Sequence, residues 1–182
     1  MKVSDICESI SKTFPNNQEY VIFLNTSDVL NGKILHSNYS LVKDLPGQAK
    51  KTFNKYDILY SEIRPKNNRF AFIDFNNTKD YVISTKLMVI RCIQDIVIPK
   101  YLFYFLTSDT IINHLQEVAE SRSGTFPQIT FEEIKSLDIC LPSLTIQQHI
   151  VDTIRSSLIF QLLFLLIPYS YQIVLIIQRR FS

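Results

Sequence analysis

The spacing of hydrophobic residues changes once along the chain, near residue 99, and this change limits the folds open to it. Before residue 99, apolar residues form short runs rich in Val, Ile, Phe and Tyr, separated by polar turns, as in β-strands. After it, they recur at helical spacing. Strands followed by helices indicate an α+β fold. We therefore predict a curved, mostly antiparallel sheet with helices, followed by a C-terminal helix.

The expected strands are apolar runs bounded by turn residues. They lie at residues 20–24, 58–63, 70–75, 81–84, 87–93 and 137–141. Asn31 and Gly32 mark a tight turn before a short run at residues 33–35. Pro65 breaks the chain after the second strand.

The first two expected helices have recognisable ends. Pro99 can open a helix because proline is tolerated at the first helical position. Asp109 can cap the next helix, which should end before Gly124. The two helices should therefore follow each other closely after the last strand of the sheet.

Two later helices are predicted from capping boxes, in which a threonine and a Glu or Gln three residues on satisfy backbone donors. Thr130 with Glu133 should open a short helix, and Thr145 with Gln148 a longer one. The longer helix should carry an apolar side formed by Ile146, Ile150 and Ile154.

Length and composition fit one folded domain with an appendage. The chain has 182 residues, of which 46% are hydrophobic and only 3 are glycine, which argues against disorder. Its formal net charge of +2 neither demands nor excludes a nucleic-acid partner. We predict a domain over residues 1–145, and the start of a helix with an atypical apolar tail over residues 146–182.

Signatures of catalysis and of metal binding are absent from the sequence. The cysteines have no zinc or disulfide spacing and are expected to be buried, reduced thiols, and the histidines are isolated. These residues are Cys7, Cys92, Cys140, His36, His114 and His149. No Gly-rich phosphate loop, methyltransferase motif or carboxylate pair is recognisable. We expect a non-catalytic protein, and a cytoplasmic one because its N-terminus lacks an apolar signal region.

Several segments stand in a characteristic order over roughly residues 1–154. They are residues 57–65, 84–91, 99–106, 124–129 and 141–151. Together they resemble the target-recognition domain of type I restriction-modification specificity subunits. The family usually has glycine where Tyr56 stands, and an acidic residue is commoner at Lys86. Family members often carry Pro-Pro and Glu-Gln in the last segment, where this chain has Pro-Ser and Gln-Gln.

The resemblance implies a reader of double-stranded DNA with no chemistry of its own. Such subunits carry two recognition domains, each reading half of a split site, held apart by long helices that pair as a coiled coil. Methyltransferase and restriction subunits dock on them and use S-adenosylmethionine, ATP and Mg²⁺, so no cofactor is expected in this chain. With one recognition domain, the chain would be a half-subunit that pairs with a second copy, or a truncated product.

Three groups of residues have the chemistry for DNA contacts. Arg reads guanine, Asn and Gln read adenine, and Lys, Ser and Thr bind phosphates. The first group is Arg64, Lys66, Asn67, Asn68 and Arg69; the second is Arg122, Ser123, Gly124, Thr125 and Gln128; the third is Lys50 and Lys51. The alternative for each group is a solvated polar turn.

The end of the chain departs from the family pattern. No charged residue occurs from Leu158 to Ile177, which by composition is a transmembrane candidate, although Pro168 lies in its middle. A spacer helix would be charged on one face. The departure favours a reading frame altered after about Arg155, with a membrane-attached protein carrying a cytosolic α+β domain as the alternative. It also predicts weak or no complex formation with a methyltransferase subunit unless the tail pairs in trans.

Overall fold

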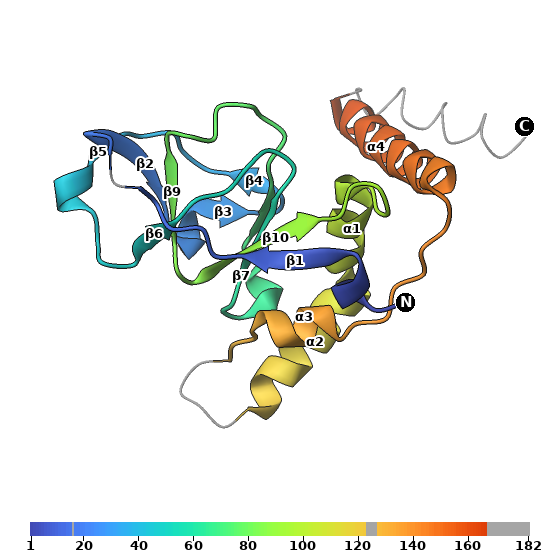
Figure 1. Ribbon diagram of the computed structural model, residues 1–182. Coiled ribbons are helices and arrows are strands. Elements are labelled where there is room, and N and C mark those ends of the chain that lie inside the picture. The colour runs from blue at the N-terminus through green and yellow to red at the C-terminus, as the bar shows by residue number, and fades with distance from the viewer. Residues whose placement is uncertain (16, 123–126, 167–182) are drawn as a thin grey trace, which may run out of the picture.

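The computed structural model describes residues 1–15, 17–122 and 127–166, and Figure 1 shows strands on one side of the molecule and helices on the other. The central sheet has the strand order β1 (Cys7–Ile10), β10 (Leu87–Cys92), β7 (Ile58–Ser61) and β8 (Phe70–Phe72). The outer sheet has the order β5 (Ser40–Leu41), β2 (Tyr20–Leu24), β9 (Tyr81–Ser84) and β6 (Ala49–Lys51). β3 (Val29–Leu30) and β4 (Lys33–Ile34) form a hairpin. All pairs are antiparallel except β2 with β9.

The helices follow the sheets in the chain, as the change in hydrophobic spacing predicts. They are α1 (Pro99–Leu106), α2 (Asp109–Ser121), α3 (Phe131–Lys135) and α4 (Leu144–Leu166). Short 3-10 turns are η1 (Val3–Asp5), η2 (Thr26–Asp28), η3 (Val42–Asp44) and η4 (Pro65–Asn67). The predicted α+β class, with mostly antiparallel sheets, is confirmed.

The central sheet is buried on both faces, which explains its continuous apolar runs. Because side chains alternate along a strand, Met88 and Ile90 of β10 enter a core shared with α1 and α2, whereas Leu87 and Val89 enter a core shared with the outer sheet. In β7, Tyr60 likewise enters the core shared with α1 and α2, and Leu59 enters the core shared with the outer sheet. The central sheet thus joins the two halves of the domain.

The predicted strand at residues 137–141 is wrong. Asp138 forms only an isolated bridge with Lys2, supported by an ion pair of 2.8 Å. The neighbouring apolar residues Leu137 and Ile139 are nevertheless buried. Their hydrophobicity reflects packing of this segment beside the N-terminus, not membership of a sheet.

The starts of α2 and α4 also differ from the prediction. Ser108 occupies the N-cap of α2, and Asp109 is its first helical residue. α4 begins at Leu144, so Thr145 lies inside the helix, and the Ser143 carbonyl accepts a hydrogen bond of 2.9 Å from the Gln147 N–H. Only the Thr130–Glu133 capping box is confirmed.

The buried face of α4 is centred on a glutamine. Gln147 and Val151 are buried, whereas Ile146, expected on the apolar side, is 52% exposed. The Gln147 Oε1 accepts from the Ile98 N–H at 2.9 Å, and its Nε2 donates to the Ile96 carbonyl at 3.2 Å. Because both ends of the amide are satisfied, a polar side chain is tolerated there. It attaches the start of α4 to the loop before α1.

Two of the three cysteines are buried as expected. Cys7 and Cys92 face each other across β1 and β10, and burial raises the pKa of Cys7 to about 12. Cys140 is exposed, so the expectation of a buried thiol is wrong there. Cys140 lies in the irregular segment between α3 and α4, outside both cores.

Positive φ angles mark two tight turns. Asn31 and Gly32, with φ of 48° and 87°, form the predicted tight turn, which closes the β3–β4 hairpin. Tyr56 has a φ of 71°, a left-handed conformation that is costly for a bulky side chain. Tyr56 stands where the family usually has glycine, so the structure gives a physical reason for that preference.

Replacing Tyr56 by glycine should relieve this strain. Tyr56→Gly and Tyr56→Ala both remove the ring contact with Phe72, and only glycine adopts the left-handed conformation freely. We expect Tyr56→Gly to be more stable than Tyr56→Ala by about 1 kcal/mol in urea unfolding. Equal free energies of unfolding would show that the backbone at this position carries no strain.

Candidate nucleic-acid interface

The η4 turn, defined here as residues 64–69, is a rigid polar turn after β7. Arg64 and Asn68 both have left-handed backbones, with φ of 46° and 53°, and flank the 3-10 turn on either side. The Asn67 N–H donates to the Arg64 carbonyl at 2.8 Å. Pro65 is buried beneath the turn, while Lys66 and Asn67 are exposed. The turn therefore presents a cation and an amide outward from a fixed backbone.

Helix α2 supports the η4 turn from behind. The Lys66 N–H donates to the Gln116 Oε1 at 3.1 Å. Gln116 is buried, and its Nε2 donates to the Glu120 Oε1 at 2.7 Å, which fixes the orientation of the amide. No sequence pattern predicts this role, because Gln116 resembles any polar residue of an amphipathic helix.

The structure brings the first group, the third group and Gln128 of the second group to one edge of the molecule, which we call the polar edge. Its segments are residues 48–51, 84–87, 62–69 and 127–129, and successive segments are joined by backbone hydrogen bonds. These run from Thr85 N–H to the Gln48 carbonyl (2.9 Å), Glu62 N–H to Lys86 (3.0 Å), Ile129 N–H to Glu62 (2.8 Å) and Arg64 N–H to Pro127 (3.0 Å). In Figure 1 this edge runs along the lower side of the sheets, from β6 toward α2.

Five of the predicted residues on the polar edge have exposed side chains. They are Lys50, Arg64, Lys66, Asn67 and Gln128. Lys86 also lies there, forming an exposed pair of 3.4 Å with Glu62. Asn68 is half-buried. Ser123, Gly124 and Thr125 lie outside the described residues.

The predicted cations Arg69, Lys51 and Arg122 form contacts within the protein. Arg69 donates through Nη1 to the Ser27 carbonyl at 2.8 Å. Lys51 donates to the Leu87 carbonyl at 2.7 Å, and burial lowers its pKa. Arg122 pairs with Glu133. Arg69 and Lys51 thus hold segments of the polar edge to neighbouring backbone, whereas Arg122 is an exposed residue paired to α3.

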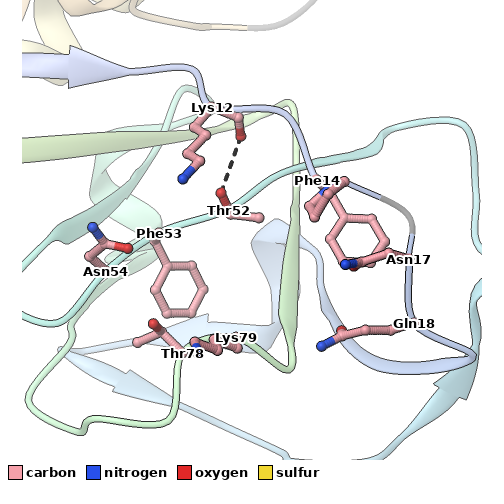
Figure 2. A pocket seen from close by; sticks show the side chains of 10 residues that line it. Lys12, Phe14, Asn17, Gln18, Thr52, Phe53, Asn54, Thr78 and Lys79 are labelled. Carbon is pink, nitrogen blue, oxygen red and sulfur yellow. Dashed lines mark hydrogen bonds between the residues drawn. The ribbon is translucent and has the colours of Figure 1, made fainter.

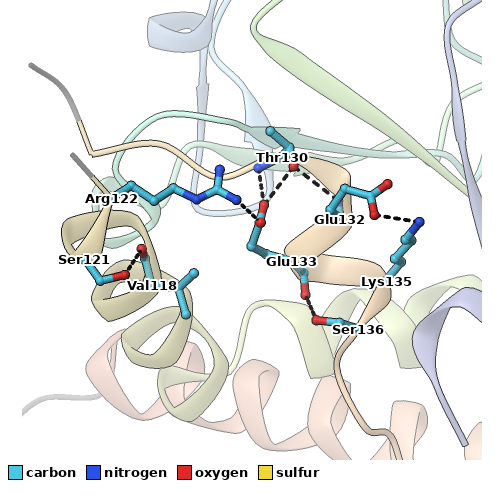
Figure 3. A network of polar contacts seen from close by, with 8 residues as sticks. All are labelled: Val118, Ser121, Arg122, Thr130, Glu132, Glu133, Lys135 and Ser136. Carbon is cyan, nitrogen blue, oxygen red and sulfur yellow. Dashed lines mark hydrogen bonds and ion pairs between the residues drawn. The ribbon is translucent and has the colours of Figure 1, made fainter. Parts of the chain in front are cut away.

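Figure 3 shows how Glu133 ties α2 to α3. Its carboxylate accepts from the Thr130 N–H at 2.7 Å and from the Thr130 hydroxyl at 2.8 Å, and it pairs with Arg122 just beyond α2. Burial opposes the charged form, but the hydrogen bonds from Thr130 and the charge of Arg122 outweigh it and lower the pKa of Glu133. One carboxylate thus ties the residue after α2 to the start of α3.

The described residues contain no group of three or more His, Cys, Asp or Glu that could hold a metal ion. In the same part of the chain, no helix has the length and apolar character to span a bilayer.

Comparison with known proteins places the chain in a family. Residues 1–158 match the family model described as the type I restriction modification DNA specificity domain. The chain is 52% identical over 153 residues to the type I restriction enzyme HindI specificity subunit of Haemophilus influenzae, covering 84% of this chain and 33% of that protein. The chain thus spans about a third of the length of this curated relative.

Two solved structures share the fold. One is the HsdS subunit from Thermoanaerobacter tengcongensis, with a TM-score of 0.74 and 25% identity over 86% of this chain and 40% of that one. The other comes from a study of complex assembly and conformational transition of the type I R-M system, with a TM-score of 0.74 and 23% identity over 87% and 41%. The family match, the curated relative and these folds agree: the chain belongs to the type I restriction modification DNA specificity domain family.

Proposed function

We propose that this chain is a non-catalytic DNA-recognition module of a type I restriction-modification system and reads one half of a split site in double-stranded DNA. The polar edge carries the proposal. It gathers exposed Arg, Lys, Asn and Gln side chains on a backbone joined by hydrogen bonds, in a chain whose family is defined as a DNA specificity domain. Rigid placement of such groups is what sequence readout needs.

Each exposed residue has a role that its chemistry suits. Asn67 and Gln128 would read adenine edges and Arg64 guanine, because these side chains match the donor and acceptor pattern of those bases in the major groove. Lys50 and Lys66 would neutralise phosphates. Ser123, Gly124, Thr125 and Asn68 would contribute backbone and side-chain contacts to the DNA backbone. Lys51 and Arg69 would hold the edge in shape.

The proposed partners are those that the family resemblance implies. The chain would direct methyltransferase and restriction subunits in the cytoplasm, and S-adenosylmethionine, ATP and Mg²⁺ would bind to those partners. A second copy would supply the other half-site, with α4 as the first turns of the spacer. The family match ends at residue 158, where the uncharged tail begins. This supports a reading frame altered after about Arg155 and weak assembly with a methyltransferase subunit.

Arg122, which was predicted to contact DNA but pairs with Glu133, allows a direct test of DNA binding. Glu133→Gln should keep the capping box, because glutamine can also accept from the Thr130 N–H, but it removes the charge that holds Arg122. The freed guanidinium would then contact a phosphate. We expect Glu133→Gln to bind duplex DNA about threefold more tightly than the wild type at about 50 mM salt, with a salt slope steeper by roughly one unit.

The same titration tests the wild-type chain. Its affinity for duplex DNA should fall as salt rises from about 50 to about 200 mM. Glu132→Gln is the matched control, because Glu132 pairs with Lys135 and not with Arg122. Absence of duplex binding by the wild type at low salt would refute the proposed function. Equal salt slopes for the wild type, Glu133→Gln and Glu132→Gln would show only that Arg122 does not contact DNA.

A further inference from the structure

A pocket of about 400 Å³ opens in the half of the domain formed by the outer sheet (Figure 2). Its walls come from three segments of the chain, and the lining residues are Lys12, Phe14, Pro15, Asn17, Gln18, Thr52, Phe53, Asn54, Thr78 and Lys79. Two backbone hydrogen bonds hold the first wall to the second: the Phe14 N–H donates to the Lys50 carbonyl at 2.8 Å, and the Thr52 N–H to the Lys12 carbonyl at 3.0 Å. Its size is in the range of small-molecule sites.

Several polar groups that line the pocket have no partner in the part of the chain that the structure describes. The amines of Lys12 and Lys79 and the amides of Asn17 and Gln18 have no hydrogen-bond or ion-pair partner among the described residues. The Gln18 Oε1 is shielded from solvent, so its lack of a donor is costly. No Asp or Glu lines the pocket. Its unused groups therefore suit a ligand with an anionic part and a hydrogen-bond donor.

The floor of the pocket is aromatic. Phe53 is 2% exposed, and its ring lies 5.6 Å from that of Tyr81 and 6.4 Å from that of Phe75, which fixes its position. Phe14 is also buried and lines the same pocket. Fixed rings favour a planar ligand, because aromatic groups pack on them by stacking or edge contacts.

We propose that this pocket binds a nucleotide, with the phosphate at Lys12 and Lys79, the base against Phe14 and Phe53, and the Gln18 amide at the base edge. A nucleotide combines the anion, the planar ring and the N–H donor that the lining calls for. The nucleotide is either a free one or a unit of a DNA strand, since both offer the same chemistry.

The test compares fragments of the ligand on the full chain by calorimetry. Deoxyadenosine monophosphate should bind saturably and more tightly than inorganic phosphate or deoxyadenosine alone. Lys12→Met with Lys79→Met, and separately Gln18→Leu, should each weaken this binding about tenfold. The matched control, Lys33→Met with Lys43→Met, removes two exposed lysines outside this pocket and should bind like the wild type.

A second arm distinguishes the two sources of the nucleotide. If the monophosphate does not bind but the pocket variants weaken duplex DNA binding about tenfold relative to the lysine control, the pocket takes a nucleotide of the DNA strand. If neither nucleotide nor DNA binding responds to the variants, the inference is overturned. Duplex binding that persists unchanged in that case leaves the proposed DNA-reading function standing.

Discussion

Removing Lys66 and Asn67 together should weaken specific DNA binding about 100-fold. The base contact proposed for Asn67 is worth roughly 1 to 3 kcal/mol, and the phosphate contact proposed for Lys66 adds to it. Both side chains are exposed at the tip of the η4 turn and make no hydrogen bond with the described residues. Folding should be unaffected, because the backbone of the turn is held by the Gln116 amide and by Pro65. The effect is measured as the equilibrium affinity for the DNA motif that the wild-type chain enriches from a random duplex pool.

The two positions should contribute differently. Lys66→Ala alone should weaken binding to all sequences and reduce the salt slope by about one unit, while Asn67→Ala should relax the preference at one base pair. The matched control is Lys43→Ala with Asn38→Ala. It also removes one exposed amine and one exposed amide, but at the β5–η3 end of the outer sheet. An equal loss of affinity in the control would show that the effect is general electrostatics and not the η4 turn.

Arg91→Met should lower the free energy of unfolding by about 3 kcal/mol, because it leaves a buried carboxylate without its cation. Asp57 is 1% exposed and receives hydrogen bonds of 2.8 and 2.7 Å from the Arg91 guanidinium. In the variant, the Asn54 N–H still donates to the Asp57 carboxylate at 2.7 Å. The expected loss is therefore at the lower end of the roughly 3 to 5 kcal/mol that breaking a buried ion pair costs. The melting temperature should fall by roughly 6 to 12 °C.

Two comparisons isolate the Asp57–Arg91 pair. Asp57→Asn combined with Arg91→Met should recover part of the lost stability, since a neutral amide is cheaper to bury than an unpaired charge. Lys86→Met breaks the exposed pair with Glu62 and should cost less than about 1 kcal/mol. If Arg91→Met costs no more than Lys86→Met, the pair does not hold β7 to β10.

Local sequence patterns were enough to predict most elements with a strong hydrophobic signal. The strand at residues 81–84 and the start of α1 at Pro99 have the predicted bounds, because turn residues and proline delimit them chemically. β1 and β6 were missed, since their polar residues give no clear alternation. The segment at residues 137–141 was misassigned because apolar residues packed beside the N-terminus look like a strand in sequence.

The residues of the candidate interface could be predicted from the sequence only as separate groups. Nothing local in the sequence indicates that Arg64 and Pro127 share a backbone hydrogen bond, or that Glu62 joins two turns, because these are contacts between distant segments. Nor does the sequence show that Arg69 and Arg122 are occupied by internal partners. A charged side chain in a loop is available to bind DNA only when the folded protein offers it no internal hydrogen-bond acceptor or ion-pair partner.

The most direct test of the account is selection of bound duplexes from a random DNA pool by the full chain, repeated at two salt concentrations. We predict enrichment of one short motif of about 3 to 5 base pairs, with affinity that falls as salt rises. The enriched motif should lose a base preference in Asn67→Ala and keep it in the Lys43→Ala, Asn38→Ala control. Salt-dependent binding without any enriched motif, or no binding at either salt concentration, would contradict the proposal that the polar edge reads a half-site.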